Sequence, residues 1–206
     1  YNLYIMNDEI WSDIIFPEAP FNSIYLLGNE RCRRVMSVFG WSKSFGIAGM
    51  RIGCVYTTDP ALFERMVEKS DVMSTAGGIS SLSQIAGTAC MHNYDWVDAF
   101  LVHLKGNRDY AVDRLKHMPL VKAYAPRATY LLYVDIRAFG MKSEDFTDYM
   151  KQKVKLALVS GGEKFFGQGS EGYIRICFAT SRGILEEGLN RLEQGIRMLM
   201  EEKGLH

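Results

Sequence analysis

The stretch "GWSKSFGIAGMRIG", Gly40 to Gly53, governs the interpretation of this sequence. It carries one lysine, Lys43, and one arginine, Arg51, among glycines and apolar residues. A buried core would not accept two cations without a partner, because an unpaired buried charge is costly. Small residues let the backbone approach a phosphate closely, the arginine fork suits that anion, and Ser42 adds a hydroxyl donor. The stretch therefore predicts a site in which both cations face an anionic group; the alternative is a surface loop with solvated cations.

The sequence around this stretch indicates an α/β layer over residues 1–95. Runs that are apolar on both alternating faces are typical of strands buried on both sides of a parallel sheet. Asp59 and Pro60 predict the start of a helix, with Asp59 as its N-cap, and another helix is expected near residues 81–92. The strand-like runs are "NLYIMND", "RVMSVF" and "IGCVYTT", at residues 2–8, 34–39 and 52–58.

The pattern changes after a long amphipathic helix, which is expected from Asp95 to about His117. Short β-like runs then follow, interrupted by a helix near residues 143–154, and a terminal helix begins near Gly183. These runs are "LVKAY", "TYLLYVDI", "LALVSG" and "YIRICFA". We expect three parts: part of a large α/β domain at residues 1–95, a bridging helix at 96–118 and a small α+β domain at 119–206.

Composition argues against several classes of partner. Lys+Arg and Asp+Glu are both 24 in 206 residues, so the formal net charge is zero, which disfavours nucleic acid and anionic membranes as partners. No apolar run approaches membrane-spanning length and no signal peptide is visible, so a cytoplasmic protein is expected. The cysteines lack CxxC spacing and the histidines lack ligand spacing, which predicts buried free thiols and no metal site. The cysteines are Cys32, Cys54, Cys90 and Cys177.

The stretch from Gly40 to Gly53 closely resembles the pyridoxal-phosphate lysine signature of class I/II aminotransferases, which have fold type I. Trp41 departs from the signature, which usually has a smaller or unbranched apolar residue there. The resemblance implies that Lys43 forms a Schiff base with pyridoxal 5'-phosphate, while Ser42 and Arg51 bind the phosphate. The matching positions are Gly40, Ser42, Lys43, Gly46, Ile47, Gly49, Arg51, Ile52 and Gly53.

Asp8 stands in "IMNDEIWSDI", at the carboxyl end of an expected strand, where α/β folds place ligand contacts. A carboxylate there can pair with a pyridinium nitrogen and keep it protonated. The stretch resembles the family motif "DEIY", which implies that Asp8 is the partner of the pyridine nitrogen. Trp11 stands where the motif usually has tyrosine; it lacks the hydroxyl but keeps one N–H donor, so it contributes to the cofactor site by that donor or by packing.

Arg175 lies between Ile174 and Ile176 in "EGYIRICFATS", an apolar strand-like run. An arginine there needs an anionic partner, because it cannot lose its charge. The run resembles the family segment "EGYIRISFA", which implies that Arg175 binds the substrate α-carboxylate with two hydrogen bonds. The alternative is an ion pair with a nearby acid, such as Glu171 or Asp135.

The resemblance extends over essentially all 206 residues but covers only the C-terminal half of a family member. It implies transfer of an amino group between an amino acid and a 2-oxo acid, by an enzyme that is a homodimer at full length. The family's glycine-rich phosphate loop and ring-stacking aromatic residue lie upstream of the matched part. We therefore expect the chain to be a fragment that is inactive alone.

Two other functions stay open. A carbon–sulfur β-lyase, similar to cystathionine β-lyase, would share Lys43, Asp8 and Arg175, and "DEIWSDIIF" resembles the "DEIH.D" motif of that group. Arg51 within "GMRIG" favours the aminotransferases, because many such lyases vary there. A non-catalytic effector domain is the third possibility, since some transcription regulators carry an aminotransferase-like domain. No basic segment of the chain supports that third function.

Overall fold

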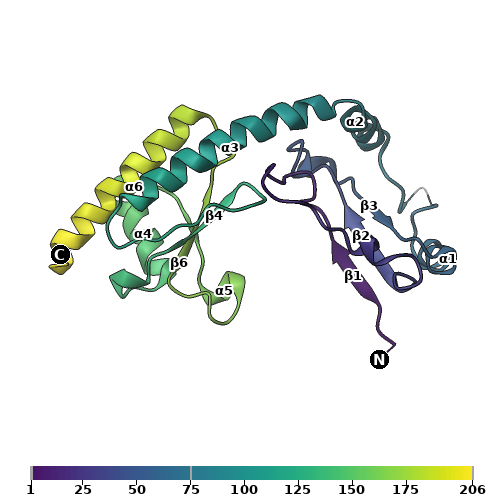
Figure 1. Ribbon diagram of the computed structural model, residues 1–206, viewed down its shortest axis with the longest axis horizontal. Helices are drawn as coiled ribbons and strands as arrows, with labels where there is room; N and C mark the ends of the chain where they lie inside the picture. The colour runs from purple at the N-terminus through teal and green to yellow at the C-terminus, as the bar shows by residue number, and fades with distance from the viewer. Residues whose placement is uncertain (1, 75, 206) are drawn as a thin grey trace. The chain divides into compact units, whose positions relative to one another are not determined.

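The computed structural model describes residues 2–74 and 76–205. They form two compact units, Tyr1–Leu101 (unit 1) and Val102–His206 (unit 2), and each unit is described by itself. Helix α3 (Tyr94–Lys116; Figure 1) lies where a long helix is predicted and ends one residue before the expected end. The division between the units falls inside it. No helix in the described part of the chain is long and apolar enough to cross a lipid bilayer.

Unit 1 contains a sheet with the order β1-β2-β3. Strands β1 and β2 run parallel, with Asp8 opposite Val38, whereas β3 is antiparallel to β2. The segments that follow β1 and β2 therefore leave the sheet at the same end, which is where α/β folds bind ligands. The strands are β1 (Ile5–Asp8), β2 (Val35–Phe39) and β3 (Cys54–Tyr56).

Strands β1 and β3 depart from the prediction of strands buried on both faces of a parallel sheet, since β3 is antiparallel and Val55 is exposed. The sequence of β1 is apolar, yet Ile5 is 47% exposed and Met6 is 74% exposed. The physical reason is the place of β1 in the sheet, because β2 is the one strand that pairs with β1 among the described residues. Apolar residues of a strand become buried only where a neighbouring layer or strand covers them.

Four helical segments lie wholly within the described part of unit 1, and the predicted cap of α1 is present. Asp59 Oδ1 accepts a hydrogen bond of 2.8 Å from Leu62 N, and Pro60 occupies the first position of α1. Ser80 caps α2 in the same way, through Ser83 N at 3.2 Å. The segments are η1 (Ile24–Leu27), η2 (Ala48–Met50), α1 (Pro60–Lys69) and α2 (Ser81–Met91).

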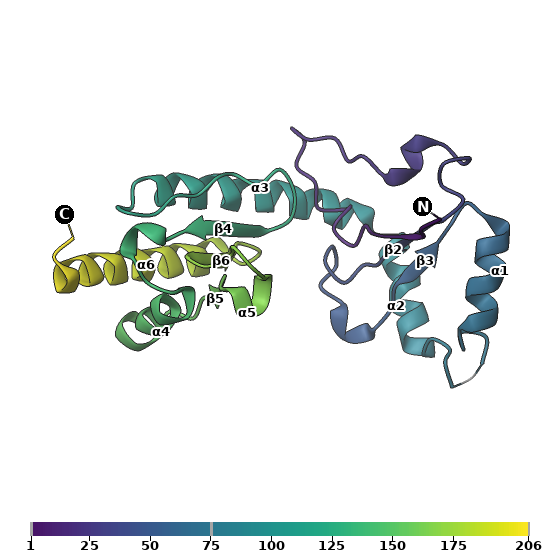
Figure 2. The ribbon, with the colours of Figure 1, turned by 90° about the horizontal axis from the view of Figure 1, so that it is seen from below.

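Unit 2 is built on an antiparallel sheet with the order β4-β6-β5. Alternate residues of β4 and β6, including Leu132 and Ile174, are buried, so this face forms the core. Tyr133 and Arg175 are directly paired, and their side chains share the opposite face. Figures 1 and 2 show α3 and α6 side by side over one face of the sheet. The strands are β4 (Leu131–Asp135), β5 (Val159–Ser160) and β6 (Tyr173–Cys177).

The other elements of unit 2 differ in part from the sequence prediction. Helix α4 (Ser143–Val154) has the predicted limits, and α6 (Arg182–Lys203) begins within one residue of the expected start. The run at residues 120–124 forms only a bridge between Lys122 and Asp135 rather than a strand. The remaining helical turns are η3 (Arg137–Phe139) and α5 (Glu163–Phe166). Of the four cysteines, Cys54 and Cys177 are exposed, so the prediction of buried thiols is wrong for these two.

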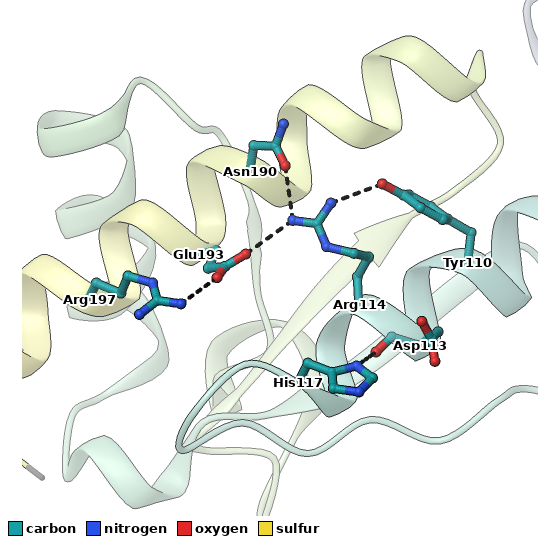
Figure 3. Close-up of polar contacts among 7 residues, drawn as sticks. All are labelled: Tyr110, Asp113, Arg114, His117, Asn190, Glu193 and Arg197. Carbon is teal, nitrogen blue, oxygen red and sulfur yellow. Dashed lines mark hydrogen bonds and ion pairs between the residues drawn. The ribbon is translucent and has the colours of Figure 1, made fainter.

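A polar network joins α3 to α6 on the surface of unit 2 (Figure 3). The Arg114 guanidinium donates to the Tyr110 hydroxyl at 2.9 Å, to Asn190 Oδ1 at 2.9 Å and to Glu193 Oε2 at 3.1 Å. Arg197 donates to the other oxygen of Glu193 at 2.7 Å. Glu193 therefore connects two arginines, one on each helix.

This network predicts a pH dependence of stability. Hydrogen bonds from Arg197 and then Arg114 hold the pKa of Glu193 below its ordinary value of 4.5. Because the folded-state pKa is lowered, the stabilisation is complete above pH 4.5 and is lost as the pH falls through the lowered pKa. Glu193→Gln should lower the free energy of unfolding at pH 7 by about 0.5–1 kcal/mol, and by less at acid pH. Urea unfolding of both proteins at several pH values measures this; an equal deficit at every pH would contradict it.

Candidate functional site

The first candidate residue, Asp8, ends β1 and is exposed. Its Oδ1 accepts a hydrogen bond of 3.0 Å from the backbone N–H of Ile10. The turn continues with Ser12 N donating to Glu9 O at 3.0 Å and Ile14 N donating to Trp11 O at 2.9 Å. Asp8 and Trp11 are thus carried by one hydrogen-bonded turn at the carboxyl end of β1.

Lys43 lies in the segment after the carboxyl end of β2, just as the turn with Asp8 and Trp11 lies at the carboxyl end of β1. Its Nζ lies 5.3 Å from the centroid of the Trp11 ring, within the range of a cation–π contact. The parallel pairing of β1 and β2 explains the contact, because both segments emerge at the same end of the sheet. The structure thus brings Lys43 and Trp11 together, although they lie 32 positions apart in the sequence.

Ser42, Lys43 and Arg51 line one cleft of about 330 Å³. The other lining residues are apolar or glycine: Ile10, Ala48, Ile52 and Gly53. In the part of the chain that the structure describes, neither Lys43 nor Arg51 forms an ion pair. Two cations that share a cleft without an acid leave it suited to an anionic ligand.

Close packing at two glycines joins the ends of this stretch. A Cβ atom on Gly40 would lie 3.3 Å from both the Gly53 Cα and the Ile52 carbonyl oxygen. A Cβ atom on Gly53 would lie 3.0 Å from the Phe39 carbonyl oxygen. Glycine at both positions lets the chain return to its starting point, so that Arg51 joins Ser42 and Lys43 at the cleft.

The residues of unit 1 fit pyridoxal phosphate. The cleft offers an amine to an aldehyde, and it offers a guanidinium and a hydroxyl to a phosphate. Ile10 connects the cleft with Asp8, since its side chain lines the cleft and its N–H donates to that carboxylate. These residues therefore offer a group to each of three parts of the cofactor: Lys43 to the aldehyde, Ser42 and Arg51 to the phosphate, and Asp8 to the pyridine nitrogen.

Arg175 belongs to unit 2, and its surroundings do not support the alternative of an ion pair with Asp135 or Glu171. Asp135 binds Arg137 instead, through bonds of 3.0 Å to Nε and 2.7 Å to Nη2. Side-chain hydrogen bonds from Arg137 lower the pKa of Asp135. Glu171 accepts from the Ser143 N–H. The Arg175 guanidinium lies over the Phe166 ring, with Cζ 5.5 Å from the ring centroid.

Sequence reasoning missed Glu9, the residue next to Asp8. Glu9 is 7% exposed, and its carboxylate accepts from Ser23, Asn7 and Tyr56. Burial acts to raise the pKa of Glu9, but these hydrogen bonds outweigh it and the pKa is lowered. Burial and then the hydrogen bond to Glu9 raise the pKa of Tyr56 to about 12. The one available signal was an acid beside an apolar strand, which does not identify its partners.

The comparison with known families decides the identity. The model of the family described as "Aminotransferase class I and II" matches residues 1–192. The chain belongs to this family. Its fold is the C-terminal part of fold type I, as expected from the resemblance.

Individual members of the family show how much of the fold is present. The aspartate aminotransferase of Pyrococcus horikoshii is 30% identical over 199 residues, which are 95% of this chain and 49% of that protein. A PLP-bound structure from Clostridium difficile 630, assigned as an aminotransferase, has a TM-score of 0.87 at 31% identity, over 95% of this chain and 50% of the other. A Corynebacterium diphtheriae protein assigned as a PLP-dependent β-cystathionase has a TM-score of 0.85 at 26% identity, over 96% and 51%. The chain spans about half the length of these relatives.

Proposed function

We propose that the chain is the C-terminal part of a pyridoxal-phosphate-dependent aminotransferase. The reaction would move an amino group between an amino acid and a 2-oxo acid. The observation that carries the proposal is the cleft after β2, where Lys43 and Arg51 lie without an acidic partner among the described residues. The family membership supports the same class of chemistry.

Each candidate site residue in unit 1 has a stated role in the proposed reaction. When bound, pyridoxal phosphate supplies an aldehyde and an electron-withdrawing ring. Lys43 would hold the aldehyde carbon and would later move the substrate α-proton as general base and acid. Ser42 and Arg51 would bind the phosphate, and Asp8 would keep the pyridine nitrogen protonated. Trp11 would pack beside Lys43, consistent with the contact between its ring and Nζ.

Arg175 would bind the substrate α-carboxylate. An arginine is suited to this role because its planar fork donates two parallel hydrogen bonds to a carboxylate. Both acids considered as protein partners, Asp135 and Glu171, are engaged by other groups. Arg175 therefore keeps its donors for a ligand.

The proposal extends to organisation and setting. Unit 1 would be part of the large cofactor-binding domain, with residues 96–118 as the bridging helix and residues 119–206 as the small domain. The full-length protein would be a cytoplasmic homodimer that binds neither nucleic acid nor a membrane. Alone, residues 1–206 would bind the cofactor weakly and remain inactive.

A carbon–sulfur β-lyase is the second candidate, since β-cystathionase is the assignment of one of the similar structures. Both enzymes would use Lys43, Asp8 and Arg175, but the lyase eliminates a substituent from the β-carbon. The full-length protein should exchange amino groups between amino acids and 2-oxo acids, and it should not release pyruvate from cystathionine. Pyruvate release without exchange would favour the lyase, and loss of both activities would favour a non-catalytic effector domain.

Trp11 gives a test of the cofactor position. Trp11→Tyr should leave cofactor binding nearly unchanged, because an aromatic ring still lies beside Lys43. The new hydroxyl can donate to the phenolic oxygen of the cofactor and stabilise its deprotonated form. The pH at which the visible absorbance of the bound cofactor changes should therefore fall. Trp11→Phe is the matched control without a hydroxyl, and identical titrations of the two variants would mean that residue 11 does not face that oxygen.

A further inference from the structure

Glu9 is a buried carboxylate that the proposed reaction does not use. Its Oε1 accepts from Ser23 Oγ at 2.7 Å and from Asn7 Nδ2 at 2.8 Å, and its Oε2 accepts from the Tyr56 hydroxyl. Among the described residues no lysine or arginine pairs with it. Neutral donors therefore stabilise the negative charge of Glu9, and together their hydrogen bonds fix the orientation of its carboxylate.

The three donors come from separate parts of unit 1. Asn7 belongs to β1, Ser23 lies just before η1, and Tyr56 ends β3. Asn7 also donates to Ser37 of β2 at 3.0 Å, so the polar layer reaches all three strands. A carboxylate bound in this way connects the end of β1 with the rest of the unit.

The backbone of Glu9 is fixed as well. Its N–H donates to the Val38 carbonyl at 2.9 Å, which continues the pairing of β1 and β2 beyond Asp8. Its carbonyl accepts from Ser12 N at 3.0 Å, within the turn that carries Trp11. Since side chains alternate along a strand, Asp8 points to the face of the sheet opposite Glu9. Glu9 therefore stabilises the turn from the face of the sheet opposite Asp8, and its side chain does not lie on the face to which Asp8 points.

We propose that Glu9 is the positioning residue of this turn. Its buried carboxylate fixes the backbone from Asp8 to Trp11, and so sets the direction of the Asp8 carboxylate and the place of the Trp11 ring beside Lys43. The inference rests on the proposed function for what Asp8 and Trp11 bind. Loss of the carboxylate removes the acceptor to which the Tyr56 and Ser23 hydroxyls donate, and lets the turn open while the sheet remains folded.

The first test needs no cofactor. Amide hydrogen exchange of residues 1–206 is compared among the unaltered chain, Glu9→Gln, Glu9→Ala and the control Asp59→Ala, which removes a helix cap in the same unit. The Ile10 and Ser12 amides should exchange about five- to tenfold faster in Glu9→Ala than in the unaltered chain. Asp59→Ala shows how much of any increase comes from lower global stability alone. Glu9→Gln, which keeps one acceptor oxygen, should show a smaller increase. If Glu9→Ala does not fold, Glu9→Gln and Tyr56→Phe provide the comparison.

The second test uses the full-length protein with pyridoxal phosphate. Glu9→Gln should weaken cofactor binding about fivefold and shift the pH titration of the visible absorbance, whereas Asp59→Ala should change neither. Lower thermal stability with unchanged Ile10 and Ser12 exchange and an unchanged titration would overturn the positioning role. Failure of the unaltered protein to attach the cofactor to Lys43 would instead overturn the proposed function, and the exchange experiment would still decide the role of Glu9.

Discussion

Lys43→Ala should abolish the borohydride-stable attachment of pyridoxal phosphate to the full-length protein. Borohydride reduces the link between a lysine amine and the cofactor aldehyde, and Lys43 is the lysine that lines the cleft with Arg51. Loss of its proton transfer should also lower the rate of amino-group exchange roughly 10²- to 10⁴-fold. Peptide mapping after borohydride reduction locates the attached cofactor, and fixed-time activity assays measure the rate of amino-group exchange.

Lys69→Ala is the matched control for this experiment. Lys69 ends α1 in the same unit, and its side chain is 80% exposed beside Glu68. This variant should keep both the attachment and the rate. A label found on any lysine other than Lys43 in the unaltered protein would show that the cofactor site has been assigned incorrectly.

Arg175→Lys should raise the KM for the amino acid strongly while cofactor binding stays nearly intact. Lysine keeps the charge but loses the planar fork, which should cost about 1–3 kcal/mol of substrate binding. The rise in KM should be seen with substrates that carry the α-carboxylate, because Arg175 would bind that group. Steady-state kinetics and a spectroscopic cofactor titration separate the two quantities.

Arg137→Lys provides the control on the same unit. Arg137 is also exposed near the sheet, but it is engaged by Asp135 through two hydrogen bonds. Its replacement should leave KM unchanged. If Arg175→Lys loses the cofactor rather than substrate affinity, Arg175 has been assigned to the wrong ligand.

Local sequence signals predicted much of the fold. Asp59 and Pro60 determine where α1 begins, because a capping carboxylate and a ring that fixes φ act within one turn. The glycines at positions 40 and 53 were recognised as part of a motif, and the structure adds the reason, which is backbone contact between the ends of the stretch. The contact between Lys43 and the Trp11 ring was not predicted, and the parallel pairing of β1 and β2 explains it.

Contacts between distant parts of the chain could not be predicted in this way. Ser23 and Tyr56 are 14 and 47 residues from Glu9, and nothing near those residues marks them as its partners. The exposure of β1 was missed because an apolar sequence reports a preference for burial, whereas burial itself depends on what pairs with the strand. The sequence left open the alternative of an ion pair between Arg175 and Asp135, although Arg137 lies closer in sequence to Asp135 and binds it in the structure.

The position of β1 at the end of its sheet has a consequence for the handling of this chain. Ile5 and Glu9 donate their N–H groups to β2, so the alternating N–H groups of Met6 and Asp8 point away from it. Such a row of free donors and acceptors, next to exposed apolar side chains, is a template for adding another strand. At high concentration, copies of the chain would associate edge to edge and precipitate, and a second polypeptide that supplied a matching strand would keep them in solution.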